Sequence, residues 1–273
     1  MAELIQMFSY EFVQRALIVG FLISFCAALL GVILVQKRYA LIGHGLGDVG
    51  FASTSLAVAL DLPILAVSTP IVIIAACAIM FYSQRSKSSG DTAIGMVSTG
   101  ALAIGVVITA LSGGFNVDVS DYMFGSILAI SDADVLLSLV LSAIIILLFV
   151  LCYNRLFLVT CDETFARASG IPVGFYQFMI ALLTALTVVL GMRMMGSLLI
   201  SSLIIFPAVT AGKLVKSFKA VVGVSVLLSI VCFFCGIILS FVWNLPTGAS
   251  IVIVDIVVLL VVMLGKKIAS KVQ

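Results

Sequence analysis

The only histidine of the chain, His44, lies four residues before Asp48, in the otherwise apolar stretch 43–60. Residues at positions i and i+4 share one face of a helix, so the imidazole and the carboxylate are predicted to point the same way. Imidazole nitrogen suits zinc, iron and related metals, whereas a carboxylate alone favours harder ions. The pair could therefore offer two ligands to a divalent cation, and two to four such ligands would hold an ion only transiently.

Glycines surround this pair and leave little side-chain surface beside it. They allow another helix, or a small desolvating ion, to approach closely. The four glycines in question are Gly43, Gly45, Gly47 and Gly50. An alternative interpretation is structural: His44 donates to Asp48 or to a backbone carbonyl and locks two glycine-rich helices together.

A second buried acid is predicted near the end of the chain. Asp255 stands about halfway along the apolar run 248–265, and only Asp48 and Asp255 lie well inside predicted membrane spans. An uncompensated carboxylate at the centre of such a helix costs at least ~2.5–3.5 kcal/mol. Asp255 therefore needs a partner, a proton or an ion, and it is a further candidate for a cation path.

The elements that position these groups must lie in a membrane. Of the 273 residues, 63% are hydrophobic and 10% charged, with a mean hydropathy of +1.38. Soluble domains are roughly 45–50% apolar and about 25% charged. The chain is therefore predicted to be a polytopic membrane protein. Its basic residues are scattered between apolar spans rather than gathered on one face, which excludes a nucleic-acid-binding protein.

Apolar runs of membrane-spanning length predict an all-α bundle of about nine transmembrane helices in a single domain, 1–273. Pro207 is predicted to break or kink the seventh span, and Cys232 and Cys235 are predicted to act as small hydrophobes rather than as a redox pair. The nine predicted spans are 16–35, 41–60, 63–82, 91–112, 134–153, 173–191, 195–211, 220–242 and 248–265.

The distribution of Lys and Arg predicts the orientation. All basic residues except Arg15 and Arg193 fall on one side of the predicted spans. The positive-inside rule then places the N-terminus outside and the C-terminus in the cytoplasm. Arg193, close to the outer surface, is expected to extend to water.

Two connecting segments are more than simple links. The outer segment 112–134 is acidic, and its apolar middle, 123–130, could form a re-entrant or interfacial helix. It is either a solvated loop or a surface that gathers cations or docks a cationic partner. The inner segment 154–172 is predicted to hold a short helix over Asp162–Ser169, capped by Thr160 or Asp162 and ended by Gly170. Such a helix could lie at the interface or act as a lever for a partner.

Four motifs carry a resemblance to a known family over nearly the whole chain. They are KRYALIGHGLGDVGF (37–51), DYMFGSILAIS (121–131), CDETFARASGI (161–171), and GMRMMGSLLISSLIIFPAVTA (191–211) followed by LPTGASIVIV. The chain resembles the permease subunits of the zinc/manganese/iron-type ABC importers, and it is most similar to the zinc-uptake branch.

The resemblance implies a multi-pass protein of the bacterial plasma membrane that is not itself an enzyme and has no intrinsic cofactor. It also implies two permease subunits, expected to be two copies of this chain, two cytoplasmic ATPases that bind ATP, and an extracytoplasmic metal-binding protein. Zinc is the transported ion that the resemblance favours. The coupling element that it implies comprises Asp162, Glu163, Ala166, Arg167 and Gly170, seated in a cleft of each ATPase.

The chain departs from the family pattern at two places. The family usually has Asp followed by His four residues later, and here His44 and Asp48 stand in exchanged order. The zinc branch also tends to have Asn where this chain has Asp255. Manganese, iron or a metal chelate remain open as substrates, and so does pairing with a different permease chain.

Two functions of other classes compete with the one that this resemblance implies. A proton-coupled secondary transporter could use His44, Asp48 and Asp255 as a proton relay, and it would work without a partner ATPase. An intramembrane metalloenzyme is disfavoured because one His and two scattered Asp form no H-E-x-x-H or comparable site.

Overall fold

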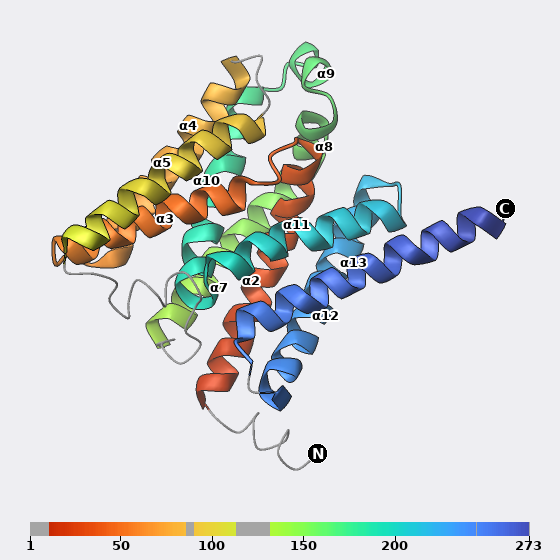
Figure 1. Cartoon of the computed structure of the whole chain (residues 1–273). Coiled ribbons are helices and arrows are strands. Elements are labelled where there is room, and N and C mark those ends of the chain that lie inside the picture. The colour runs from red at the N-terminus through yellow and green to blue at the C-terminus, as the bar shows by residue number, and fades with distance from the viewer. Residues whose placement is uncertain (1–10, 86–89, 113–131, 244, 273) are drawn as a thin grey trace.

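The computed structural model describes residues 11–85, 90–112, 132–243 and 245–272, and within them the chain is entirely helical (Figure 1). An apolar segment in a membrane must satisfy its backbone groups internally, which a helix does. The helices are α2 (Glu11–Gln36), α3 (Ile42–Ala59), α4 (Ile64–Arg85), α5 (Gly90–Leu111), α7 (Asp132–Leu151), α8 (Tyr153–Cys161), α9 (Glu163–Ala168), α10 (Val173–Met195), α11 (Ser197–Leu214), α12 (Phe218–Trp243) and α13 (Thr247–Val272).

A long helix overlaps each of the nine predicted spans. Within the described ranges, seven helices are long and apolar enough to cross a membrane, namely α2, α4, α5, α10, α11, α12 and α13. Taken together, α7 and α8 are also long and apolar enough to cross a membrane, but they are bent by 72° at their junction. Helix α3 is not apolar enough to be counted as a span, since glycines, His44 and Asp48 lower its hydropathy. The total of nine spans therefore stays a prediction.

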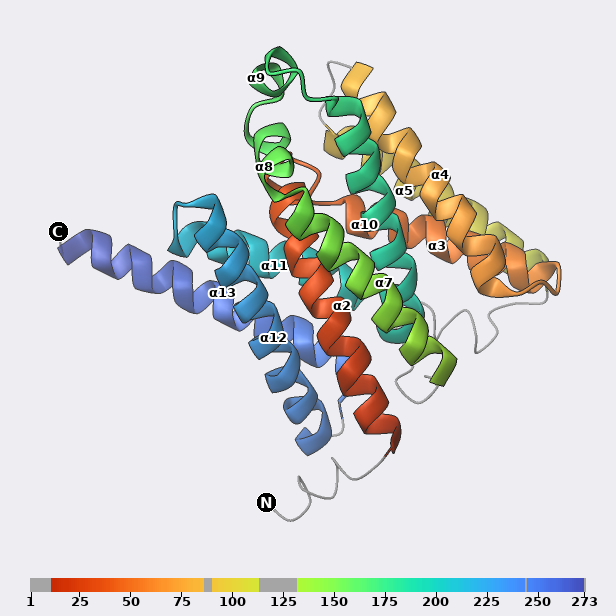
Figure 2. The ribbon, with the colours of Figure 1, turned by 180° about the vertical axis from the view of Figure 1, so that it is seen from behind.

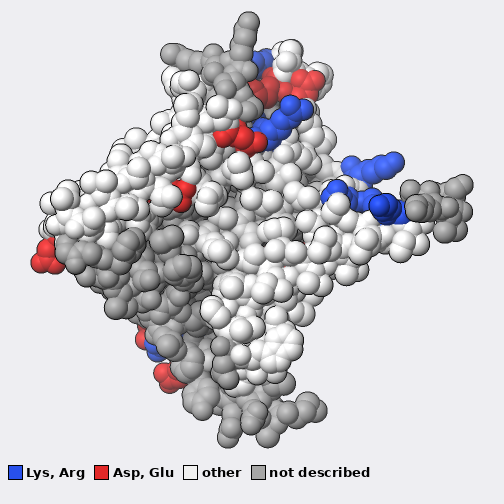
Figure 3. Space-filling model, in the orientation of Figure 1, with Lys and Arg blue, Asp and Glu red and all other residues white. Residues whose placement is uncertain are grey.

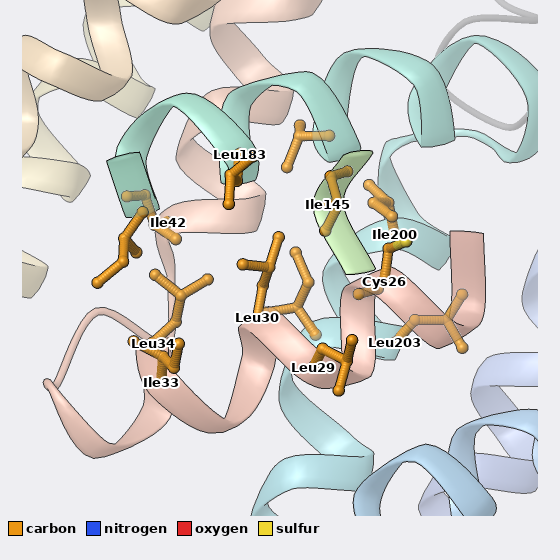
Figure 4. Packing of buried hydrophobic residues seen from close by; sticks show 14 of the residues in the cluster. Cys26, Leu29, Leu30, Ile33, Leu34, Ile42, Ile145, Leu183, Ile200 and Leu203 are labelled. Atoms are coloured by element: carbon orange, nitrogen blue, oxygen red, sulfur yellow. The ribbon is translucent and has the colours of Figure 1, made fainter. Parts of the chain in front are cut away.

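Helix α2 is the central column of the bundle. It packs against α7, α10, α11 and α12, and it lies between α7 and α12 when the molecule is seen from behind (Figure 2). Its apolar side chains interlock with those of four neighbouring helices in one core (Figure 4). The labelled side chains from the neighbours are Ile42 of α3, Ile145 of α7, Leu183 of α10, and Ile200 and Leu203 of α11.

Helices α3, α4 and α5 form a flank on one side of this column (Figure 1). Polar side chains join them across apolar surroundings: the Thr109 hydroxyl donates to Ser55 at 3.0 Å, and the hydroxyls of Thr54 and Ser68 lie 3.5 Å apart. Hydroxyl pairs of this kind hold helices together where apolar surface offers little specificity.

Most charged side chains in the view of Figure 3 lie towards the ends of the molecule, and the broad surface between them carries one isolated acidic group. At one end of α2, Arg15 pairs with Asp132 at 2.9 Å. At the other end, Lys37 pairs with Glu163 at 2.6 Å. The two ends of α2 thus mark opposite faces of the molecule, and which face is cytoplasmic stays a prediction from the Lys and Arg distribution.

Two predicted features can be compared with the described residues directly. Helix α11 continues through Pro207 to Leu214, so this proline does not end the helix. Arg193, near the end of α10, is exposed, as expected for a side chain that extends to water. The predicted re-entrant helix 123–130 and most of the outer acidic segment lie outside the described residues.

Candidate functional site

The His44–Asp48 pair lies in the first half of α3. His44 Nε2 is 3.8 Å from Asp48 Oδ2, so the two side chains lie on one helix face. The imidazole is 62% exposed, whereas the Asp48 side chain is only 14% exposed. The Asp48 carboxylate is therefore largely covered by the bundle, whereas the His44 imidazole is accessible.

Asp48 is anchored by a serine of the neighbouring helix. The Ser98 hydroxyl of α5 donates to Asp48 Oδ2, the same oxygen that faces His44. Helices α3 and α5 run side by side, and the Thr109–Ser55 contact holds them together further along. Sequence reasoning did not identify Ser98, because 50 residues separate it from Asp48 and only the packing of two helices brings them together.

Glycines allow α3 to pack closely against its neighbouring helices. A Cβ atom at Gly43 would come within 3.0 Å of Ile204 Cδ1, and one at Gly47 within 3.3 Å of Ser197 Cβ, both on α11. A Cβ at Gly45 would come within 2.6 Å of Ile94 on α5. Gly50 is buried as well. Larger residues would push α3 away from α5 and α11, and would thereby displace His44 and Asp48.

The pair offers few ligands to an ion. One imidazole nitrogen and one carboxylate can contact a cation from one chain, with the Ser98 hydroxyl behind them. Across the described ranges, no group of three or more His, Cys, Asp or Glu side chains could hold a metal. A closed four-ligand zinc cage is therefore not found in the described part of one chain, and the pair is suited to transient contact.

Asp255 lies elsewhere, in a polar contact within the bundle. It is 2% exposed, and its carboxyl group meets the Ser202 hydroxyl of α11 and the Cys232 thiol of α12. Its Oδ2 atom has no hydrogen-bond partner. The structure does not bring Asp255 to the His44–Asp48 pair: Asp255 contacts α11 and α12, whereas His44 faces Asp48 and Asp48 contacts α5. Cys232 is buried as expected for a small hydrophobe, although its contact with Asp255 was not foreseen.

Replacing Asp255 by asparagine is expected to leave metal uptake and folding intact and to raise the thermal stability of the purified protein. The amide keeps the shape of the side chain and removes a buried charge that lacks a full set of partners. Leucine is the matched control, and it should destabilise by about 1–3 kcal/mol because it leaves polar partners unsatisfied. Thermal unfolding in detergent, alongside uptake, measures both effects. A well-folded asparagine variant that loses uptake would show that the carboxylate itself serves the cation path.

The predicted inner helix over Asp162–Ser169 is observed as α9, at the tip of the molecule (Figure 1). Asp162 is its N-cap: the carboxylate accepts a hydrogen bond from the Phe165 backbone N–H at 2.9 Å. Gly170 has φ 77°, a left-handed conformation that glycine adopts without strain, and it ends the segment. Both residues thus shape α9, and their part in coupling to an ATPase stays a prediction.

The remaining residues of α9 divide between two faces. Ala166 is fully buried, and Glu163 turns inward to bind Lys37. The outer face of α9 consists of the exposed residues Thr164, Phe165, Arg167 and Ala168. Phe165 is 56% exposed, and the sequence analysis did not select it. Its position three residues after the N-cap and next to buried Ala166 is the signal that could have placed it outward.

Comparison with known proteins agrees with this architecture. Residues 9–266 match the model of a family described as the ABC 3 transport family. The chain is 30% identical over 245 residues to the high-affinity zinc uptake system membrane protein ZnuB of Haemophilus influenzae, covering 89% of this chain and 94% of that protein. It is 28% identical over 249 residues to the manganese transport system membrane protein MntC of Halalkalibacterium halodurans, covering 91% and 85%.

Its fold is similar to a solved structure described as PsaBC from Streptococcus pneumoniae in complex with Fab. The TM-score is 0.83 at 27% sequence identity, with 96% of this chain and 94% of that chain covered. Helical packing, family match and relatives agree over nearly the full length. The chain belongs to the ABC 3 transport family, as a metal-transport permease of the membrane.

Proposed function

We propose that this protein is the permease subunit of an ATP-binding-cassette importer that moves a divalent transition metal, zinc in the first place, into the cytoplasm. The observation that carries the proposal is the exposed His44 imidazole beside the anchored Asp48 carboxylate on α3. The zinc-uptake relative supports zinc, and the imidazole nitrogen suits that ion.

A second copy of the chain would complete the site. An imidazole that is 62% exposed in a membrane protein is costly unless it faces a cavity or a partner. Across a two-fold axis, two copies would offer two imidazoles and two carboxylates from a homodimer. Such a set binds an ion as it passes and releases it, because each copy supplies only two groups.

The energy would come from a separate ATPase dimer that binds ATP and docks against the outer face of α9. An extracytoplasmic metal-binding protein would deliver the ion to the opposite face. In this arrangement the N-terminus lies outside and the C-terminus in the cytoplasm of a bacterial plasma membrane, in accord with the positive-inside rule. In this proposal the permease itself supplies no catalytic residue.

Manganese is the second candidate substrate, and the manganese-transport relative favours it. The carboxylate of Asp48 would suit this harder ion, whereas the imidazole favours zinc. The choice between the two ions therefore depends on which group of the pair dominates the contact.

Uptake of radiolabelled zinc, manganese and iron(II) into proteoliposomes tests the proposal. The liposomes contain the permease with its ATPase and binding protein, and the variants are wild type and the exchanged pair His44→Asp with Asp48→His. We expect ATP-dependent uptake with zinc preferred, and we expect the exchanged variant to retain it, since a two-ligand face tolerates either order. If neither form carries any free metal, the assignment of a metal substrate is wrong.

A further inference from the structure

The junction that follows α2 holds a buried cation. The Lys37 side chain is only 4% exposed, and its ammonium group lies 2.6 Å from Glu163 Oε1 on α9. A buried ammonium is stable only when it is paired and hydrogen-bonded. The pair joins residues that are 126 positions apart, and it connects α9 to the turn between α2 and α3.

Gln177 of α10 completes this contact. Its amide Nε2 donates to the same Glu163 oxygen at 2.6 Å, so one carboxylate atom accepts from both Lys37 and Gln177. Gln177 is buried, and its own Oε1 has no hydrogen-bond partner. The carboxylate of Glu163 thus contacts both α10 and the turn after α2, while its side chain stays 41% exposed.

Two further contacts hold the segment that carries α9. The Cys161 thiol lies 3.9 Å from Gln36 Oε1 at the end of α2, and Arg155 of α8 donates to the Tyr176 hydroxyl of α10 at 2.7 Å. Polar contacts from α8 and α9 thus reach the end of α2 and the start of α10, while Tyr153 and Phe157 of α8 also stack against Phe218 of α12. Among these contacts of the described residues, Lys37–Glu163 is the one that is an ion pair.

We propose that Lys37, Glu163 and Gln177 form a transmission link that carries movement of α9 to α2 and α3. The inference rests on the proposed function, because it assumes that an ATPase moves α9. Lys37 is five residues before Ile42, where α3 begins, and α3 carries His44 and Asp48. A displacement of α9 would pull on Lys37 and so shift the start of α3. Glu163 is in this sense a positioning residue.

The link differs from a docking surface in what its removal changes. Loss of a docking residue weakens binding of the ATPase. Loss of the link should leave binding and ATP hydrolysis intact, but fewer metal ions should enter per ATP consumed. The ratio of metal transported to ATP hydrolysed therefore separates the two roles.

The test compares five forms of the permease in proteoliposomes with the ATPase, the binding protein and zinc. The double variant Lys37→Met with Glu163→Gln removes both charges, so that no buried charge is left unpaired. Lys37→Glu places two carboxylates together, and the swap Lys37→Glu with Glu163→Lys restores opposite charges. The swap also gives the free Gln177 Oε1 a donor. Arg167→Glu, on the outer face of α9, is the matched docking control.

We expect the ratio of zinc to ATP to fall about fivefold or more in the double variant and in Lys37→Glu, a change within the usual range of coupling energies. The affinity for the ATPase should stay within about twofold of wild type in the double variant, and the swap should recover most of the lost ratio. An unchanged ratio in the double variant would overturn the proposal. So would a loss of ATPase affinity equal to that of Arg167→Glu. Zinc uptake by wild type without ATP hydrolysis would instead overturn the proposed function, and the link with it.

Discussion

Alanine in place of Asp48 is expected to lower metal uptake by about tenfold or more, by comparison with the 10–100-fold losses typical at metal sites. The substitution removes the carboxylate that faces His44 and leaves the Ser98 hydroxyl without its acceptor. Uptake of radiolabelled zinc at several zinc concentrations measures the loss, and co-purification with the ATPase shows whether the complex still assembles. Adding His44→Ala to this variant should remove the remaining uptake without preventing assembly.

Two matched variants separate charge from packing. Asp48→Asn keeps the hydrogen bond from Ser98 and removes the negative charge, so it should lose uptake nearly as far as Asp48→Ala. Ser98→Ala keeps the charge and removes the anchor, so its loss should be smaller. If Asp48→Asn transports like wild type, or if Asp48→Ala fails to assemble at all, the pair is a structural lock between α3 and α5 and not a ligand for the ion.

Reversing the charge at Arg167 is expected to weaken binding of the ATPase by about tenfold or more, and Phe165→Ala to do nearly the same. Exposed aromatic and arginine side chains at the centre of an interface commonly contribute most of its binding energy. Both side chains are exposed on the outer face of α9. Binding of the purified ATPase to the permease in detergent gives the affinity directly.

Thr164→Ala is the matched control for these two variants, since it removes a small exposed side chain from the same face. Its affinity should be close to that of wild type. If the ATPase binds both Arg167→Glu and Phe165→Ala with wild-type affinity, it docks elsewhere on the permease. Loss of the folded protein in either variant would contradict the exposed positions of these side chains.

The features that the sequence predicted well are local. The N-cap at Asp162 and the left-handed glycine at 170 lie within nine residues of each other, and their signals need no partner from elsewhere. The shared face of His44 and Asp48 likewise follows from helix geometry alone. Long apolar runs predicted an all-helical membrane protein because composition alone decides that class.

What the sequence did not predict depends on contacts between distant segments. Ser98 meets Asp48, and Lys37 meets Glu163, only after helices have packed. The contacts of Asp255 with Ser202 of α11 and Cys232 of α12 likewise follow from packing, and its part in a cation path stays a prediction. The contacts of Glu163 with Lys37 and Gln177 could not be predicted because the sequence of so short a helix does not reveal which side chains reach neighbouring helices; its place in the coupling element stays a prediction.

The ion pairs at the two ends of α2 relate the protein to the thickness of its bilayer. Arg15 and Lys37 are about 22 residues apart, which is about 33 Å along a helix at 1.5 Å per residue, and the hydrocarbon core of a typical bilayer is about 30 Å thick. Both ends are held, one by Asp132 and the other by Glu163. In lipids with longer chains the helix cannot simply slide, so either the bilayer thins around the protein or one ion pair is drawn into hydrocarbon. A change in lipid chain length then acts on the same end of α2 that contacts α9. The thickness of the membrane would in this way influence the activity of the transporter.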